Sequence, residues 1–220
     1  MIVIVMIALY VRPDMLPMDM PLFTLYNLNS VYLVYIVTTL MIVGFINAGN
    51  MTDGANGLLS IITLMFILVL YMLYPSVLNL SLIISLVSFA IYNISTGRIF
   101  LGDFGAYFLS SYVAFSSLIT YSEFNLPIFL FASLLVYPCF EITRSIFIRL
   151  ITGASIMSPD NKHLHNYIHE YILLFGFSQN IVNSLTGIII AILTSGPAFF
   201  IIYTNKLVEK SFWVNLFIIK

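Results

Sequence analysis

Residues 56–74 read NGLLSIITLMFILVLYMLY, nineteen successive positions without a charged side chain. The hydrocarbon core of a bilayer is about 30 Å thick, and a helix of roughly 20 residues crosses it. This segment is therefore predicted to span a membrane. It must do so as a helix, because each unpaired backbone group in hydrocarbon costs several kcal/mol.

Five further segments have the same character, within a boundary error of a few residues: 29–47, 77–94, 104–121, 127–151 and 180–203. Only the segment 127–151 carries charge in its interior, where Glu141 and Arg144 lie three positions apart near its end. We expect an ion pair that holds this helix end, with Arg144 also a candidate for binding substrate.

The composition of the whole chain agrees with a lipid environment. Of 220 residues, 61% are hydrophobic and 8% are charged, against about a quarter charged residues in a soluble domain. The net charge of −1 gives no basis for binding a nucleic-acid backbone. Residues 1–11 and 211–219 are apolar but too short to span, so we expect them to be partial spans of a truncated bundle. The prediction is a single integral membrane domain, 1–220, an all-α polytopic transmembrane helical bundle with about six complete spans and two partial terminal ones.

Polar residues of unusual type gather in the connections 47–56, 95–103 and 152–179. Alternate crossing of the membrane places these three connections on the same side. That side also has more Lys and Arg, five against three, and the positive-inside rule then makes it cytoplasmic.

The first of these connections places Asn47, Asn50, Asp53 and Asn56 at every third position between two apolar spans. Glycines beside them allow the backbone to approach a ligand closely. Such a loop offers a carboxylate to a cation and amides to phosphate or sugar hydroxyls. The alternative is a polar capping loop, with Asn50 or Asp53 as the N-cap of the next helix.

The second connection contains Gly97-Arg98-Ile99-Phe100-Leu101-Gly102-Asp103-Phe104-Gly105. Asp103 is predicted at the start of a helix, where the macrodipole favours an anion. An ordinary N-cap and a ligand-binding carboxylate both fit this position.

The third connection holds Lys162, His163, His165 and His169. His163 and His165 project together only if the backbone is extended or irregular, whereas His165 and His169 share a helical face. Zinc is one interpretation, but no cysteine is near and a zinc site needs three or four ligands. Phosphate binding by histidine and lysine suits the setting better, and a solvated surface loop is the remaining alternative.

Carboxylates, amides, imidazoles and basic groups are thus expected on one membrane face. Mg²⁺ prefers hard oxygen ligands and substrate phosphates. Transfer of a phosphoryl-linked group depends mainly on positioning and on neutralising charge. These residues therefore indicate phosphoryl transfer between a soluble nucleotide and a lipid.

Three motifs, NAGNMTDGANGLL, GRIFLGDFG and PDNKHLHN, occur in this order over about residues 29–203. Together they resemble the polyprenyl-phosphate N-acetylhexosamine-1-phosphate transferases. That family includes the phospho-MurNAc-pentapeptide translocase and the initiating enzymes of O-antigen, enterobacterial common antigen and teichoic acid linkage. The PDxxHLH form is more similar to the GlcNAc branch.

The resemblance implies a multi-pass enzyme of the cell membrane that transfers a sugar-1-phosphate from a UDP-sugar to polyprenyl phosphate. It assigns Mg²⁺ (or Mn²⁺) to Asp103, the nucleotide and metal pocket to Asn47, Asn50 and Asp53, and substrate contact to His163 and His165. Asn56 and Lys162 join these as substrate-binding candidates. A homodimer is compatible with the family.

This chain departs from the family pattern at several positions. Asn56 stands where a second aspartate is usual, Asn166 where a final histidine is common, and Ala106 where serine often follows the aspartate motif. The early aspartate pair of the family is missing, and Asp14 and Asp19 are expected on the opposite side of the membrane. The chain is therefore expected to correspond to the C-terminal part of the family's transferase domain.

Two classes of function remain open from the sequence. One is an active transferase, and the other is a catalytically inactive relic or membrane scaffold that retains part of the pocket. A small transporter would require charges buried in the middle of spans, which the sequence does not show apart from Glu141 and Arg144.

Overall fold

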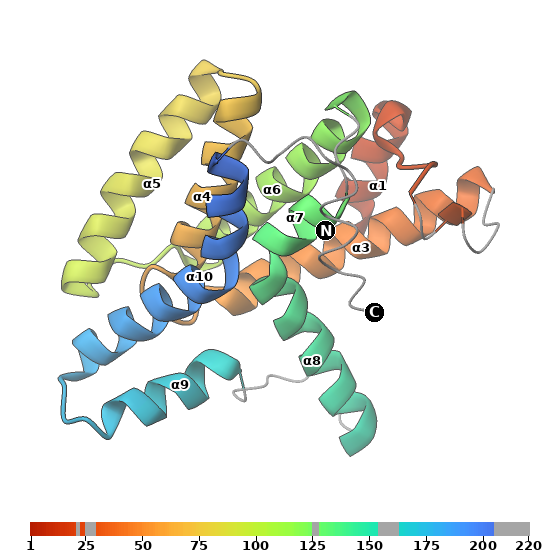
Figure 1. Cartoon of the computed structure of the whole chain (residues 1–220). Coiled ribbons are helices and arrows are strands. Elements are labelled where there is room, and N and C mark those ends of the chain that lie inside the picture. The colour runs from red at the N-terminus through yellow and green to blue at the C-terminus, as the bar shows by residue number, and fades with distance from the viewer. Residues whose placement is uncertain (21–22, 25–29, 125–127, 154–162, 205–220) are drawn as a thin grey trace.

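The computed structural model describes residues 1–20, 23–24, 30–124, 128–153 and 163–204. Within these ranges every regular element is a helix (Figure 1), which confirms the all-α prediction. In chain order the elements are α1 (Ile2–Val11), the 3-10 helix η1 (Pro13–Met15), α3 (Val31–Thr52), α4 (Leu58–Leu73), α5 (Val77–Thr96), α6 (Gly102–Phe124), α7 (Ile128–Leu134), α8 (Val136–Thr152), α9 (Leu164–Leu173) and α10 (Gln179–Tyr203).

Three of the described helices, α3, α5 and α10, are long and apolar enough to cross a membrane. They correspond to the predicted segments 29–47, 77–94 and 180–203. The predicted segments 56–74 and 104–121 correspond to α4, an apolar helix of 16 residues, and to α6, with 23 residues. Five of the six predicted spans are therefore single continuous helices.

The sixth predicted span, 127–151, is wrong as a continuous helix, because it is divided at Leu135 into α7 and α8. Pro138 lies four residues after Leu134, the last residue of α7. A proline has no N–H for the carbonyl four positions earlier, and its ring clashes with that carbonyl. The Leu134 carbonyl instead accepts a hydrogen bond from the buried Ser195 hydroxyl of α10 at 2.6 Å. The break is thus satisfied from a neighbouring helix, as backbone inside a membrane requires.

The main core lies around α4, which packs against α5 and α10. Its buried side chains belong to a cluster that α6, α7 and α10 complete. Between helices in lipid, close van der Waals packing replaces the hydrophobic drive of water, and small residues allow it. Gly49 of α3 shows this, because a Cβ there would lie 1.7 Å from the Ser110 hydroxyl of α6.

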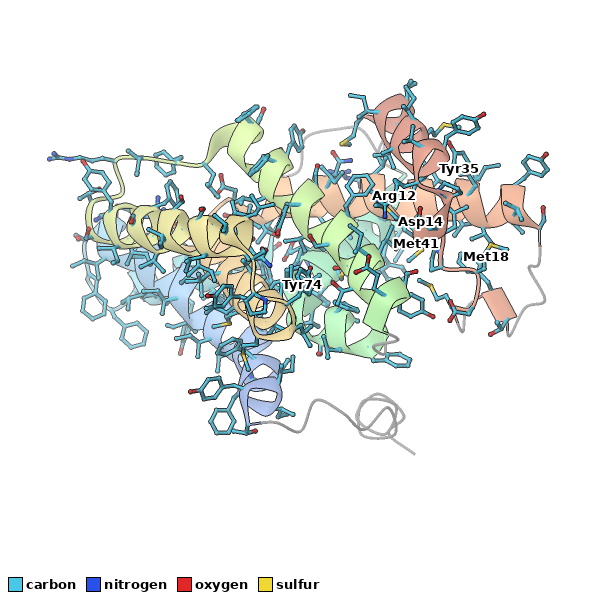
Figure 2. All side chains as sticks on the ribbon, turned by 90° about the horizontal axis from the view of Figure 1, so that it is seen from above. Arg12, Asp14, Met18, Tyr35, Met41 and Tyr74 are labelled. Carbon is cyan, nitrogen blue, oxygen red and sulfur yellow. The ribbon has the colours of Figure 1, made fainter. Side chains whose placement is uncertain are left out.

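The N-terminal helix α1 packs against α3. Val5 and Leu9 are buried with Ile42 and Ile46 of α3. The Tyr35 hydroxyl of α3 also donates to the Met6 carbonyl. Tyr35 is labelled in Figure 2. Residues 1–11 therefore form a helix attached to the bundle; the second predicted partial span, 211–219, lies outside the described residues.

One exposed face of α5 is largely apolar. Val77, Leu80, Ile84, Val87 and Ile91 are all exposed, and their spacing of three and four residues places them on one helix face. The exposed serines beside this stripe donate their hydroxyl protons to carbonyls of the same helix, so a largely apolar face of this length is expected to face lipid rather than water.

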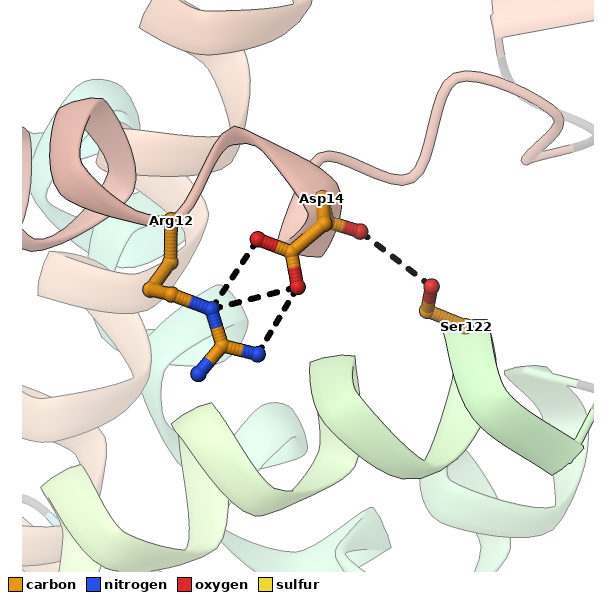
Figure 3. Close-up of polar contacts among 3 residues, drawn as sticks. All are labelled: Arg12, Asp14 and Ser122. Carbon is orange, nitrogen blue, oxygen red and sulfur yellow. Dashed lines mark hydrogen bonds and ion pairs between the residues drawn. The ribbon is translucent and has the colours of Figure 1, made fainter.

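A polar region lies at each of the two ends of α6. Near its C-terminal end, the Ser122 hydroxyl donates to the Asp14 carbonyl at 3.2 Å, and Asp14 accepts from the Arg12 guanidinium (Figure 3). Asp103 lies in the first turn of α6. Nineteen residues of helix between Asp103 and Ser122 rise about 28 Å. Asp14 is therefore at the far end of α6 from Asp103, as the alternation of spans predicts.

Candidate active site

The end of the bundle that carries Asp53, Asp103 and His165 is here called the motif end. Asp53 is the C-cap of α3, and the next helix, α4, has Gly57 as its N-cap with a left-handed φ of 79°. The alternative in which Asn50 or Asp53 caps α4 is therefore wrong, and the Asp53 carboxylate is not used as that helix's N-cap.

Asn93 of α5 joins the first two motif loops. Its carbonyl oxygen accepts from the Gly57 N–H at 2.7 Å, and its amide nitrogen donates to the Ile99 carbonyl at 2.6 Å. Asn93 is buried, so both ends of its side chain are held where hydrogen bonds are strong. One residue that the sequence did not single out thus fixes the separation of the loops that bear Asp53 and Asp103.

Asp53 lies near the start of α6, the helix that carries Asp103. Burial raises the pKa of the Asp53 carboxyl to about 7; a backbone hydrogen bond from Gly102 opposes this rise and the charge of Asp103 adds to it. Among the described residues, no group of three or more histidine, cysteine and acidic side chains is placed so that it could hold a metal ion by itself. Mg²⁺ commonly uses one or two carboxylates and completes its shell with water and substrate phosphates. The Asp53–Asp103 pair suits that ion.

The third motif meets the first at Gly54. A Cβ on Gly54 would lie 2.1 Å from Nε2 of His165, so the imidazole is packed directly against the backbone of the Asp53 loop. Only glycine permits this approach. The sequence prediction that the first and third motifs share a site is therefore consistent with the geometry.

The two motif histidines lie side by side. His163 is the N-cap of α9 with extended backbone, φ −81° and ψ 152°. Its ring stacks on that of His165 with centroids 5.3 Å apart and 14° between the planes. The expectation that these side chains project together only through extended backbone is confirmed. His169 follows on the same face of α9, since both His165 and His169 line one cavity.

Two side chains of α8 hold this histidine pair. Glu141, which is fully buried, accepts from His163 Nδ1 at 3.0 Å and from the Leu164 N–H at 2.7 Å. The Tyr137 hydroxyl is 3.0 Å from His165 Nδ1. The predicted Glu141–Arg144 ion pair is replaced by the contact of Glu141 with His163, because the start of α9 packs on that carboxylate.

His165 is neutral over the physiological range. Burial lowers the pKa of its imidazole to about 4, and the neighbouring His163 ring acts in the same direction. The Tyr137 hydroxyl contacts Nδ1 of this ring, and Nε2 faces Gly54. His165 therefore presents an uncharged imidazole beside the Asp53 loop.

Asn56 is the centre of a network of amides. Its Nδ2 donates to the side-chain oxygens of Asn180 and Ser184, each at 3.2 Å, and its Oδ1 accepts from Asn183 at 3.0 Å. The Ser184 hydroxyl in turn donates to the Ile94 carbonyl at 2.7 Å. Because that hydroxyl proton is committed, Ser184 can only accept from residue 56. An amide, with both donor and acceptor, matches these partners, whereas an aspartate would not.

A polar cavity of about 360 Å³ lies between α9, α10 and the first motif loop. Its lining is made of amides, imidazoles and glycines: Gly54, Asn56, Gly97, His165, Asn166, His169, Gln179, Asn180 and Asn183. None of these carries a fixed charge. The cavity therefore suits a ligand part that is neutral and rich in hydrogen-bonding groups.

A second cavity, of about 440 Å³, is apolar and lies between α3, α6 and the α7–α8 pair. Met41, Ile42 and Leu118 line it from α3 and α6, and Ile142 and Ile146 extend it along α8. This second cavity is here called the apolar groove.

The remaining predicted residues take different places. Asn47 donates to the Val43 carbonyl at 2.8 Å within α3, and Asn50 reaches the Tyr107 hydroxyl of α6 at 3.5 Å. The Arg144 guanidinium lies over the Tyr167 ring, 5.6 Å from its centroid. Lys162 lies outside the described residues.

Sequence reasoning missed the polar residues that open α10. Gln179, Asn180, Asn183 and Ser184 begin a helix whose remainder is mostly apolar. Amides at the start of a membrane span are a visible signal, but the residues they contact are far away in the chain.

Comparison with known proteins identifies relatives. The family model described as glycosyl transferase family 4 matches residues 1–121. A probable undecaprenyl-phosphate N-acetylglucosaminyl 1-phosphate transferase of Bacillus subtilis is 34% identical over 206 residues, covering 86% of this chain and 52% of that protein.

Two further relatives extend the comparison. An undecaprenyl-phosphate α-N-acetylglucosaminyl 1-phosphate transferase of Thermotoga maritima is 31% identical over 66% of this chain and 48% of that protein. A phospho-N-acetylmuramoyl-pentapeptide-transferase of Fervidobacterium nodosum is 35% identical over 48% of this chain and 37% of that protein. The chain spans about half, or less, of the length of these relatives.

Proposed function

Because the chain belongs to glycosyl transferase family 4, we propose that it transfers N-acetylhexosamine-1-phosphate from a UDP-sugar to polyprenyl phosphate. The product is a diphosphate-linked sugar on a lipid, which begins the assembly of a cell-surface polysaccharide. In this reaction a phosphate oxygen of the lipid attacks the β-phosphorus of the nucleotide-sugar. The bond from that phosphorus to the bridging oxygen breaks, and UMP leaves.

The observation that carries the proposal is the meeting of three separate loops at the motif end. Asp53 lies near the start of α6, which carries Asp103, the imidazole of His165 is packed on Gly54, and both Gly54 and His165 line the polar cavity. Phosphoryl transfer is largely a matter of positioning a diphosphate and neutralising its charge. Carboxylates for a cation and imidazoles that can hydrogen-bond to substrate supply both requirements.

Asp53 and Asp103 are the residues that would hold Mg²⁺ (or Mn²⁺). That ion, when bound, neutralises charge on the donor diphosphate. The protein's own contribution is to join the two loops that carry these carboxylates through Asn93 and to place the neutral His165 imidazole beside the Asp53 loop, where it can hydrogen-bond to substrate. His163, held by Glu141, adds a second imidazole on the same side.

The two cavities fit the two halves of the substrate pair. The polar cavity suits the uncharged hydrogen-bonding part of the nucleotide-sugar, where Asn56 is a binding residue. The apolar groove suits an isoprenoid chain that enters from the bilayer. The motif end then faces the cytoplasm, where the soluble donor is found.

Asp103→Asn tests the proposal, because it removes a metal-binding charge and preserves the shape of the side chain. We expect turnover to fall by roughly 100-fold or more, the scale of losing one preorganised electrostatic contact. The measurement is Mg²⁺-dependent release of UMP from radiolabelled UDP-GlcNAc by the purified protein with polyprenyl phosphate. Asp14→Asn, the same change at the opposite end of α6, is the matched control and should retain full turnover.

The same assay distinguishes an active transferase from a catalytically inactive membrane scaffold. If the chain binds UDP-GlcNAc but the unaltered protein releases no UMP, the non-catalytic scaffold is supported and the transferase is not. Near-normal turnover of Asp103→Asn would remove Asp103 from the metal site.

A further inference from the structure

Helix α9 has an exposed aromatic face that the proposed reaction does not use. Tyr167 and Tyr171 are 48% and 65% exposed, and Phe175 in the turn that follows is 65% exposed. Their spacing of four residues places them on one face, where the rings of Tyr171 and Phe175 meet edge to face, 5.8 Å apart. Leu174 and Phe177, 82% and 49% exposed, continue the same surface through the turn. These five residues are here called the α9 aromatic face.

The other side of α9 belongs to the site. His165 and Ile172 are buried, and His165 packs on Gly54. Between residues 163 and 178 the single Asp, Glu, Lys or Arg is Glu170. The segment is therefore amphipathic in an unusual way, with polar imidazoles turned inward and large apolar rings turned outward. A surface open to water would show the reverse arrangement.

The depth of the α9–α10 turn follows from its contact with α5. The Asn180 amide, at the start of α10, donates to the Ser95 carbonyl at 3.5 Å, one residue before α5 ends. α5 has 20 residues, a rise of about 30 Å, which is the thickness of the hydrocarbon core. The turn 174–178 is thus level with the boundary between hydrocarbon and headgroups, the zone in which Tyr and other amphipathic aromatic side chains concentrate.

We propose that the α9 aromatic face is inserted in the headgroup layer of the bilayer on the side of the motif end, so that α9 is an interfacial helix. Tyrosine suits this layer because its ring is apolar and its hydroxyl can remain hydrated. The exposed apolar surfaces of α10 begin immediately after the turn, at Ile181, so the lipid-facing surface is continuous from span to α9. The occupant of the face is the lipid surface itself.

This placement also connects the membrane to the histidine pair. The Arg144 guanidinium of α8 lies 5.6 Å above the Tyr167 ring, and three residues earlier on α8 Glu141 binds His163. With α9 held by lipid on one face and by α8 on its side, the imidazoles remain against Gly54. The inference concerns membrane contact and stands independently of the reaction proposed above.

The test uses tryptophan fluorescence in nanodiscs. Trp213 is the chain's one tryptophan, so a Trp213→Phe background gives a clean signal for Tyr171→Trp and, separately, for Phe175→Trp. Both substitutions replace an exposed aromatic residue with another and should preserve the fold. Tyr92→Trp, exposed on the span α5, is the control for lipid contact.

Phospholipids brominated close to the acyl carbonyl should reduce the fluorescence of tryptophan at position 171 and at position 175 at least about twofold. Aqueous iodide should quench the same fluorescence only weakly, because side chains in the interfacial layer are shielded from the solution. Strong iodide quenching without lipid quenching would overturn the proposal, because the face would then be open to water. Shielding from both quenchers would equally overturn it, and would assign the face to a protein partner or a second copy.

Discussion

Gly187→Ala is the most direct test of how α10 assembles the motif end. Gly187 is in the interior of α10, and a Cβ at this position would lie 2.0 Å from the Asn56 carbonyl oxygen and 3.1 Å from the Leu58 nitrogen. Both are backbone atoms, so no side-chain rotation relieves the overlap. Either α10 moves away or the loop that carries Asp53 and Asn56 is displaced.

The magnitude follows from overpacking. Forcing a methyl group into a filled interior typically costs about 1–3 kcal/mol, and sometimes more, whereas alanine in a helix gains back at most about 1 kcal/mol over glycine. For a chain of this size each kcal/mol changes Tm by roughly 2–4 °C. We therefore expect a Tm lowered by several degrees. Turnover should fall by about 100-fold if the Asp53 loop moves by an ångström.

Gly196→Ala is the matched control, since it makes the same change in the same helix. There the nearest atom to a new Cβ is Ile192 Cγ2 at 3.7 Å, an ordinary van der Waals contact. Melting in detergent or nanodiscs, followed by UMP release, measures both variants. If Gly187→Ala melts and turns over like Gly196→Ala, α10 does not clamp the loop and the reasoning is refuted.

Three further predictions concern the histidine pair. Glu141→Gln weakens a charge-assisted hydrogen bond to His163 that is worth about 1.5–3 kcal/mol, so this variant should have a lower Tm and a lower turnover. The control, Glu170→Gln on the exposed part of α9, should leave both quantities unchanged. If the two variants behave alike, Glu141 does not have this role. Tyr137→Phe leaves Nδ1 of His165 buried without its hydrogen-bond partner. The free energy of unfolding should then fall by about 1–3 kcal/mol, which thermal unfolding would measure. An unchanged Tm would contradict the importance of this contact. Because the folded pKa of His165 is about 4 and the ordinary value is 6.5, neutral burial stabilises the protein fully above about pH 6.5. This contribution, up to roughly 3 kcal/mol, is lost as pH falls toward 4, and His165→Asn should flatten that slope of Tm with pH.

The sequence located the spans well because hydropathy belongs to each segment separately. The predicted span 77–94 corresponds to α5, Val77–Thr96, and the predicted span 180–203 corresponds to α10, Gln179–Tyr203. The division of 127–151 was missed although its cause, Pro138, was visible. A proline can kink a helix or end it, and the outcome here depends on Ser195 of α10 receiving the freed Leu134 carbonyl.

The residues of the candidate site could likewise be predicted from the sequence only in part. Asp53, Asp103, His163 and His165 could be selected from the sequence, because such side chains between apolar spans need a reason to be there. The partner of Glu141 could not be predicted from the sequence, because Arg144 is the nearest opposite charge along the chain. His163 reaches Glu141 only when α9 packs on α8.

The sequence by itself determined that this protein is an all-α membrane bundle with its polar chemistry in three loops, because burial of apolar helices in lipid is decided segment by segment. Only the tertiary structure decided that Asn56 is held by Asn183 and Ser184 and that Gly54 carries the His165 ring. Those contacts depend on how close two helices approach, which small residues permit and no local pattern along the chain specifies.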